Sequence, residues 1–274
     1  MITKKEVSEA LALSCVESYF LPWLKQYYDV VRLYGSSFVS LRQAFDDFAH
    51  GAEYQSYTTF PRLQDLAEVY GVVVHEYRTC TADEALESIQ HQTPTDLWLM
   101  RVNQTFFAGF KRSAWREDHY ICVDKNLHWI NQYPLSEGTF DEVRFADVYD
   151  GAVCVYKVGD LTAVPPDTVR RQYGTQAFGA IRLPDSPEAL VSAVGILRMS
   201  RKRLEKYYES DAHVRRLLHE EVAALDKLYF LWQLYRLKER DKEERDREEA
   251  YGALHDGIAG IADLEKKIAE ALNR

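Results

Sequence analysis

The middle of the chain is a series of short β-rich segments, with helical sequence on both sides. Stretches rich in β-branched and aromatic residues predict strands at 72–74, 97–102, 119–123, 127–131 and 152–158. Helical spacing predicts helices before residue 70, among them Ser40–Phe48 and Thr59–Val69, and from Thr81 to about His91. Thr3–Glu6 and Thr81–Glu84 have the form of capping boxes. Helices first and antiparallel strands later predict one α+β domain over residues 1–160.

Residues 161–274 are predicted to be mainly helical. Ser186-Pro187-Glu188 has the form of a helix start, with a capping serine, a first-turn proline and an early acid. Apolar residues then follow helical spacing from Val214 to Trp232, and again from Ile261 to Leu272. These two stretches predict a long helical hairpin that turns near Gly252 or Gly257.

The charge pattern argues against a nucleic-acid partner. A net charge of -9 disfavours a phosphate-binding surface, so no nucleic-acid partner is expected. Every residue from Lys238 to Glu249 is charged, but acids match bases, which is typical of a solvated helix.

No apolar run is long enough for a membrane span, and Met1–Lys5 lacks a signal-peptide pattern, so a cytoplasmic protein is expected. The apolar stripes of the last two helices permit a homodimer, or packing onto the main domain.

Among the four cysteines, Cys15 lies in a sequence pattern that favours a reactive thiol. The four cysteines are scattered, which indicates free thiols and not a disulfide framework. Ser14-Cys15-Val16-Glu17 has the form of a capping box, which places Cys15 in the first turn of a helix. Backbone N–H groups and the helix dipole there lower a thiol pKa and could stabilise an oxyanion. The competing interpretation is a buried cysteine on a helix.

A predicted hairpin supplies the other two groups. Pairing Val123 with Leu127 across a three-residue turn places His119 directly opposite Asn131, within hydrogen-bonding reach. A one-residue slip would send one of these side chains to the other face. An amide beside the imidazole would fix its tautomer and leave the other nitrogen to take a proton from the Cys15 thiol. A zinc site that uses His119 and Cys122 lacks further ligands at suitable spacing, so no metal or cofactor is expected.

The order of these motifs resembles the papain-like fold and, more narrowly, the family of the butirosin-biosynthesis acyltransferase BtrH over about residues 13–150. The resemblance is carried by short motifs: Cys15-Val16-Glu17, a helix at Ala85–Thr93 before Pro94, His119-Tyr120-Ile121-Cys122-Val123, a second strand that ends at Asn131, and Gly138-Thr139-Phe140-Asp141-Glu142. The sequence departs from the family at the turn Asp124-Lys125-Asn126, at Asn131 where an Asp is usual, and at Asn103 where an Asp is common.

The resemblance implies a catalytic triad of Cys15, His119 and Asn131 that forms an acyl-cysteine intermediate. It implies an acyltransferase of natural-product biosynthesis, with a phosphopantetheine thioester on a carrier protein as donor and a small-molecule or peptidyl amine as acceptor. The C-terminal helices would then cover the acceptor pocket or bind the carrier protein. Two alternatives stay open: a thioesterase or cysteine peptidase on the same fold, and a non-catalytic binding or scaffold protein.

Overall fold

The chain forms two compact units. The computed structural model describes residues 2–51, 62–108, 110, 118–175, 187–240 and 244–273. The sheet unit comprises Met1–Val30 and Arg62–Val164, and the helical unit comprises Val31–Pro61 and Pro165–Arg274. The expected boundary near residue 160 lies close to the end of the sheet unit. Residues 31–61, which we expected in the first domain, group instead with the C-terminal helices.

The sheet unit is built on one six-stranded sheet in which all neighbouring strands are antiparallel. In sequence order the strands are β1 (Val73–Thr79), β2 (Leu97–Val102), β3 (Tyr120–Val123), β4 (His128–Asn131), β5 (Ser136–Thr139) and β6 (Tyr149–Val158). Their spatial order is β1-β6-β2-β3-β4-β5. The α+β class is therefore confirmed. The polar strand β5 was not predicted, because its Ser-Glu-Gly-Thr sequence has no apolar alternation.

Short helices flank this sheet. They are α1 (Lys4–Glu9), α2 (Cys15–Leu24), α5 (Leu63–Val69), α6 (Ala82–Gln90), α7 (Gln104–Phe107) and α8 (Glu142–Val148). Two predicted capping boxes are present, between Thr3 and Glu6 and between Thr81 and Glu84. We expected a helix from Thr59, but α5 begins at Leu63, and residues 59–61 lie outside the described part of the chain.

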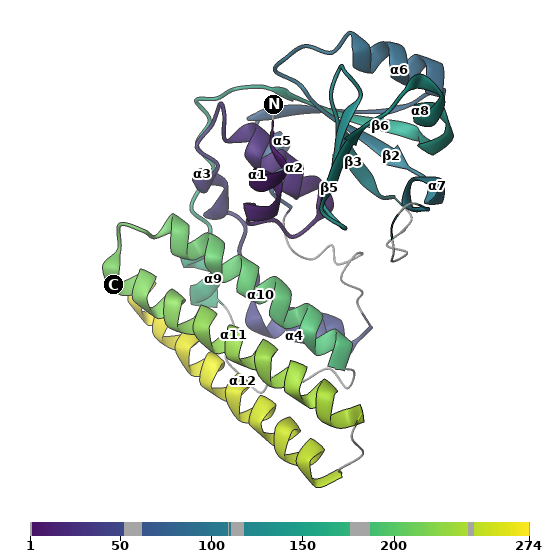
Figure 1. Ribbon diagram of the computed structural model, residues 1–274. Helices are drawn as coiled ribbons and strands as arrows, with labels where there is room; N and C mark the ends of the chain where they lie inside the picture. Colours follow the sequence, from purple (N-terminus) through teal and green to yellow (C-terminus); the bar gives the residue numbers. More distant parts are fainter. Residues whose placement is uncertain are drawn as a thin grey trace. The chain divides into compact units, whose positions relative to one another are not determined.

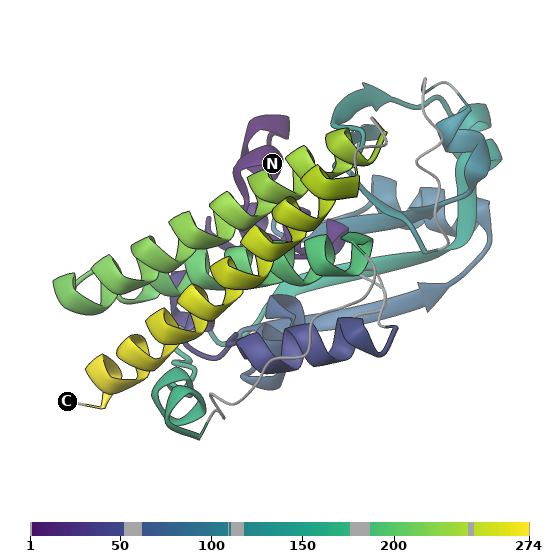
Figure 2. The ribbon, with the colours of Figure 1, turned by 90° about the horizontal axis from the view of Figure 1, so that it is seen from below.

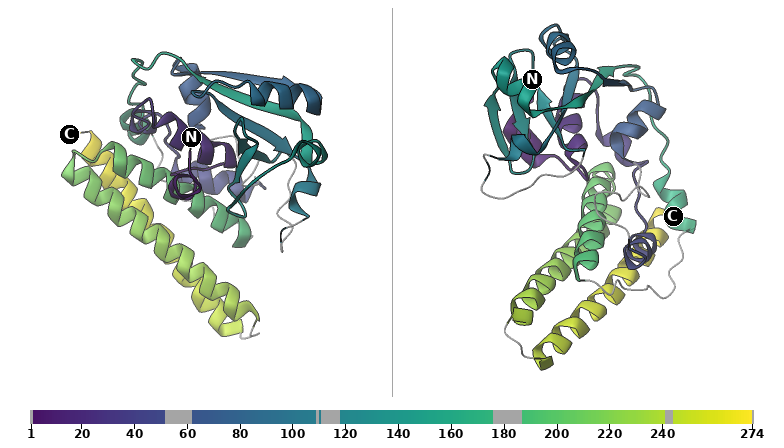
Figure 3. Two further views of the ribbon diagram at one scale, coloured as in Figure 1. Left: turned by 45° about the horizontal axis from the view of Figure 1, so that its top comes forward. Right: turned by 90° about the vertical axis from the view of Figure 1, so that its right-hand side faces the viewer.

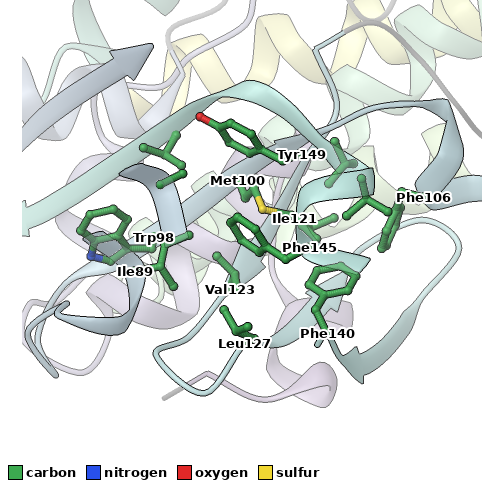
Figure 4. Close-up of a cluster of buried hydrophobic side chains, with 14 of the residues drawn as sticks. Ile89, Trp98, Met100, Phe106, Ile121, Val123, Leu127, Phe140, Phe145 and Tyr149 are labelled. Atoms are coloured by element: carbon green, nitrogen blue, oxygen red, sulfur yellow. The ribbon is translucent and has the colours of Figure 1, made fainter. Parts of the chain in front are cut away.

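The two faces of the sheet pack against different helices, as β6 shows. Val153 and Val155 belong to an apolar core that includes Ile89 of α6 and Phe145 of α8. Figure 4 shows Ile89 and Phe145 in this core. Successive side chains of a strand point to opposite faces, so Tyr156 points the other way. Its ring lies 5.2 Å from that of Phe20 in α2. Helix α2 therefore packs on the face opposite α6 and α8, next to β2 and β3 (Figure 1).

The helical unit contains no strand among its described residues. Its helices are α3 (Val31–Tyr34), α4 (Leu41–Ala49), α9 (Val169–Thr175), α10 (Pro187–Tyr207), α11 (Ala212–Arg240) and α12 (Glu244–Leu272). Helices α11 and α12 form the predicted long hairpin and pack along each other (Figure 2). The expected capping residue Ser186 lies outside the described residues, and Pro187 begins α10. Throughout the described chain, no helix is both long enough and apolar enough to cross a membrane.

Backbone contacts explain why residues 31–61 belong to the helical unit. The carbonyl of Gly35 accepts a hydrogen bond from the Thr168 amide at 3.0 Å. The carbonyl of Val39 accepts one from Nη1 of Arg201 at 2.9 Å. Helices α3 and α4 also pack on α10. The sequence predicted helices before residue 70 but carried no information about the elements that pack against α3 and α4.

The predicted position of the hairpin turn was wrong. Gly252 and Gly257 both lie inside α12, which begins at Glu244, and α11 ends at Arg240, within the charged run (Figure 3). Gly257 has a packing role instead. A Cβ atom there would lie 2.6 Å from Cδ2 of Leu228, so the missing side chain lets α11 and α12 approach closely. Among the residues that the structure describes, none has an atom within 4 Å of a Cβ atom at Gly252.

A fully buried arginine connects the elements of the helical unit. Arg201 of α10 donates from Nε to Oε1 of Glu221 in α11 at 2.8 Å and from Nη2 to Oε1 of Glu265 in α12. Its guanidinium also lies over the rings of Phe38 and Tyr173, at 5.2 Å and 5.6 Å. All three side chains are 0% exposed, so the Arg201 cation depends on its two acidic partners to offset the cost of burial.

Candidate functional site

Cys15 occupies the first position of α2, as the capping pattern predicted. The Ser14 hydroxyl accepts a hydrogen bond from the Glu17 amide at 3.1 Å and so caps the helix. The Glu17 carboxylate reaches further: it accepts from the Leu13 amide at 2.6 Å and from the Leu63 amide, at the start of α5, at 2.7 Å. Glu17 therefore ties the N-termini of two helices together beside Cys15.

His119 and Asn131 are joined by a hydrogen bond of 2.8 Å between Nε2 and Oδ1, and both side chains are buried. His119 directly precedes β3, and Asn131 ends β4. The predicted pairing of Val123 with Leu127 was wrong, because Val123 pairs with Trp129. The hairpin loop, residues 124–127, is one residue longer than expected, and Leu127 adopts a φ of 59° within it.

The hydrogen bond forms despite this shift for a geometric reason. The true register moves the pairing by two residues, which leaves every side chain on its expected face. When the pairing of β3 with β4 is continued by one residue beyond Cys122 and Ile130, Asn131 lies opposite Ile121. His119, two residues before Ile121, is then a diagonal neighbour of Asn131 on the same face of the sheet. Long side chains can still meet across a diagonal pair.

The surroundings of Asn131 determine the tautomer of His119. Nδ2 of Asn131 donates to the carbonyl of Pro134 at 2.9 Å, which turns Oδ1 toward the imidazole. Because Oδ1 only accepts hydrogen bonds, Nε2 of His119 must carry the proton. The neutral ring then has its lone pair on Nδ1. This is the protonation pattern that a general base needs when an amide holds its other nitrogen.

Neighbouring residues fix the imidazole in place. The backbone carbonyl of His119 accepts a hydrogen bond from the Val102 amide at 3.0 Å. The ring of Phe107 meets the imidazole edge-on, with 5.0 Å between centroids. The preceding residue, Asp118, has a φ of 59° and receives Nη1 of Arg101 at 3.3 Å. The contacts with Val102 and Phe107, together with the bond between the preceding Asp118 and Arg101, therefore restrict the motion of His119.

The helix of Cys15 reaches the His119–Asn131 pair through Tyr19. The Tyr19 hydroxyl donates to the carbonyl of Tyr120 at 3.3 Å and accepts from the amide of Gln132 at 2.8 Å. These partners directly follow His119 and Asn131 in the chain. No role for Tyr19 was predicted from the sequence. Its spacing of four residues from Cys15, on the same side of a helix, was the available signal.

The other cysteines lie in settings unlike that of a nucleophile. Burial raises the pKa of Cys122 to about 12. Burial also raises the pKa of Cys154. The Cys80 thiol is engaged with the hydroxyl of Tyr149 at 3.2 Å. The raised pKa values hold the Cys122 and Cys154 thiols neutral, and neutral thiols react slowly. Cys15 is the cysteine with a favourable helix position.

Asn103 has a structural role. It caps α7 by accepting a hydrogen bond from the Thr105 amide at 2.8 Å, and it donates to the carbonyl of Asp147 at 2.9 Å. An asparagine at this position can therefore connect α7 to α8.

Comparisons of the chain with protein-family models, with curated proteins and with solved structures found no match of any of the three kinds. The function therefore has to be inferred from the chemistry that these residues can perform.

Proposed function

We propose that the sheet unit is a papain-like cysteine acyltransferase that resembles the BtrH family and uses Cys15, His119 and Asn131. The observation that carries this proposal is the buried 2.8 Å bond between His119 and Asn131, which gives the imidazole a defined tautomer. Cys15 begins a capped helix, and that helix hydrogen-bonds, through Tyr19, to the residue after His119 and to the residue after Asn131. Nucleophile, base and orienting amide are thus supplied by connected elements.

The reaction has two halves, each with one proton relay. Nδ1 of His119 takes the Cys15 proton, and the sulfur attacks the thioester carbonyl. A bond forms between Cys15 Sγ and the acyl carbon, the bond to the donor sulfur breaks, and the donor thiolate takes the proton from His119. An amine then attacks the acyl-cysteine and passes its proton through His119 to the departing Cys15 sulfur. The products are an amide, a free donor thiol and the original enzyme.

Two features of the site suit a thioester donor. The leaving thiol is already a good leaving group, so the pair of Cys15 and His119 needs no strong acid. The N–H groups in the first turn of α2 can stabilise the oxyanion that forms on the acyl carbonyl. We propose a carrier protein with a phosphopantetheine thioester as donor and a small-molecule or peptidyl amine as acceptor, in natural-product biosynthesis.

The direct test is formation of the acyl-enzyme. Full-length protein incubated with an acyl N-acetylcysteamine thioester, which mimics the end of phosphopantetheine, should gain the mass of one acyl group. Cys15→Ala should gain none, and Cys122→Ser should behave like wild type. An adduct that persists in Cys15→Ala would refute the proposal.

A second step separates transfer from hydrolysis. The isolated acyl-enzyme is mixed with a panel of primary amines or with buffer alone, and the decay of the adduct is followed by intact-protein mass spectrometry. Amine-dependent decay with amide formation supports the acyltransferase. Decay at the same rate in buffer, with free acid as the product, identifies a thioesterase instead.

A further inference from the structure

Tyr19 lies where α2, the helix that begins with Cys15, meets the segments that carry His119 and Asn131. Its side chain is 0% exposed, and it is one helical turn from Cys15. Burial raises the pKa of its hydroxyl well above the usual value, so the group is protonated throughout the range in which enzymes work. It can therefore donate one hydrogen bond and accept another at all such pH values.

The two partners of this hydroxyl come from different strands. One is the carbonyl of Tyr120, in β3, at 3.3 Å, and the other is the amide of Gln132, just after β4, at 2.8 Å. Each partner is the residue that follows a member of the His119–Asn131 pair. A single oxygen atom thus contacts both segments that hold the pair, and it does so from the helix that carries Cys15.

Glu17 ties the first turn of α2 to the Leu63 amide of α5 at 2.7 Å, and two other contacts of α2 lie further from its N-terminus. Trp23 donates from Nε1 to the carbonyl of Thr95 at 2.8 Å, and Phe20 packs on Tyr156. Apolar packing tolerates small sliding movements, whereas a directional hydrogen bond of 2.8 Å does not. Tyr19 is therefore the residue of α2 that is best placed to fix the position of the first turn relative to His119.

We propose that Tyr19 is a positioning residue that sets the separation of Cys15 and His119 by hydrogen-bonding to both of the segments that carry the base and its amide. This inference rests on the proposed function of Cys15 as nucleophile. A thiolate is stabilised by a nearby imidazolium, so a helix that drifts from His119 should raise the Cys15 pKa and slow acylation.

Tyr19→Phe tests this, because it removes only the hydroxyl. The matched control is Tyr28→Phe, which removes another buried hydroxyl of the sheet unit, one that donates to the carbonyl of Ala163 at 2.9 Å. For each protein, the rate of Cys15 alkylation by iodoacetamide is measured from pH 5 to 10, together with the rate of acylation by the N-acetylcysteamine thioester. All measurements are made at least about 15 °C below the unfolding midpoint of each protein, so that unfolding does not contribute.

We expect Tyr19→Phe to move the alkylation profile upward by about one pH unit and to slow acylation about tenfold at pH values below the wild-type Cys15 pKa, because ten times less thiolate is present there. Tyr28→Phe should keep the wild-type profile. An unchanged profile for Tyr19→Phe, or an equal shift in Tyr28→Phe, would overturn the positioning role while leaving the nucleophile intact. If wild type itself shows neither acylation nor a depressed Cys15 pKa, the proposed function fails instead.

Discussion

His119 and Asn131 share a buried hydrogen bond of 2.8 Å although they are diagonal neighbours and not direct partners across the hairpin. Asn131 is itself held by the carbonyl of Pro134, which also accepts from the Ser136 hydroxyl at 2.9 Å. The amide therefore has one orientation, and the imidazole has one tautomer.

Asn131→Ala should weaken both catalysis and folding. The imidazole loses the acceptor that fixes it, so acylation of Cys15 should slow at least about tenfold, within the range of general-base effects. Unfolding free energy should fall by about 1–3 kcal/mol, because buried partners lose their hydrogen bonds. Asn131→Asp keeps an acceptor toward His119 and should retain more activity than Asn131→Ala. Equal acylation rates in wild type and Asn131→Ala would contradict the orienting role.

Glu17→Ala should be strongly destabilising. Its buried carboxylate accepts two backbone hydrogen bonds, from Leu13 and Leu63, and bonds to a charged group are worth about 1.5–3 kcal/mol each. Urea denaturation should show a loss of about 3 kcal/mol or more. The matched control is Glu6→Ala, since the Glu6 carboxylate accepts from the Thr3 amide at an exposed helix start. That change should cost less than about 1 kcal/mol. Similar losses of unfolding free energy in the two variants would show that burial of the Glu17 carboxylate adds nothing to stability.

Cys122 should resist alkylation in the folded protein. Burial raises its pKa from 9.0 to about 12, so almost no thiolate exists at pH 8. Iodoacetamide should modify Cys15 first and should reach Cys122 only in urea, as peptide mass spectrometry would show. The same shift means that the contribution of this thiol to stability is complete below pH 9 and is lost as the pH rises through 12. Labelling of Cys122 as fast as Cys15 at pH 8 would disprove this.

Glu221→Gln should stabilise the helical unit increasingly as the pH rises. Burial, together with the neighbouring Glu265 carboxylate, raises the pKa of Glu221 well above 4.5, although Arg201 opposes the shift. An acid with a raised folded pKa stabilises the fold below its unfolded pKa, and this stability is lost as the pH rises toward the folded pKa. The advantage of Glu221→Gln over wild type should therefore grow above pH 4.5, by at most about 1.4 kcal/mol per pH unit.

Urea denaturation at pH 5, 6 and 7 would measure this difference. Glu220→Gln is the control, because Glu220 is on the same helix but is partly exposed and pairs with Arg216 at 3.5 Å. A constant difference between Glu221→Gln and wild type across this range would mean that Glu221 does not hold a proton in the folded state.

Two glycines of α12 should respond oppositely to alanine. At Gly257 the new Cβ atom would lie 2.6 Å from Leu228, so Gly257→Ala should cost about 1–3 kcal/mol through overpacking. At Gly252 there is open space, so Gly252→Ala should gain about 0.5–1 kcal/mol from helix propensity. Thermal unfolding followed by circular dichroism gives both values. Changes of the same sign at the two positions would argue against close packing at Gly257.

The sequence predicted where helices and strands lie along the chain better than it predicted which segments pair or pack with one another. The alternation of apolar residues has a period of two, so the faces of β3 and β4 were correct even though the register was wrong by two residues. The turn at Gly252 or Gly257 was wrong, because a glycine at a close helix contact looks the same in sequence as a glycine in a turn. The role of Tyr19 depends on backbone atoms more than 100 residues away, which no local pattern reveals.

The segment 31–61 has a consequence for how the chain folds during synthesis. It leaves the ribosome between the two pieces of the sheet unit, yet its own partners lie in α9 to α12, more than 100 residues later in the chain. Buried residues such as Phe45 must therefore wait, exposed to water, while the strands of the sheet are still being made. The nascent chain is open to chaperone binding at this stage, because a chain that ends at residue 164 contains the whole sheet unit but none of the helices that cover Phe45.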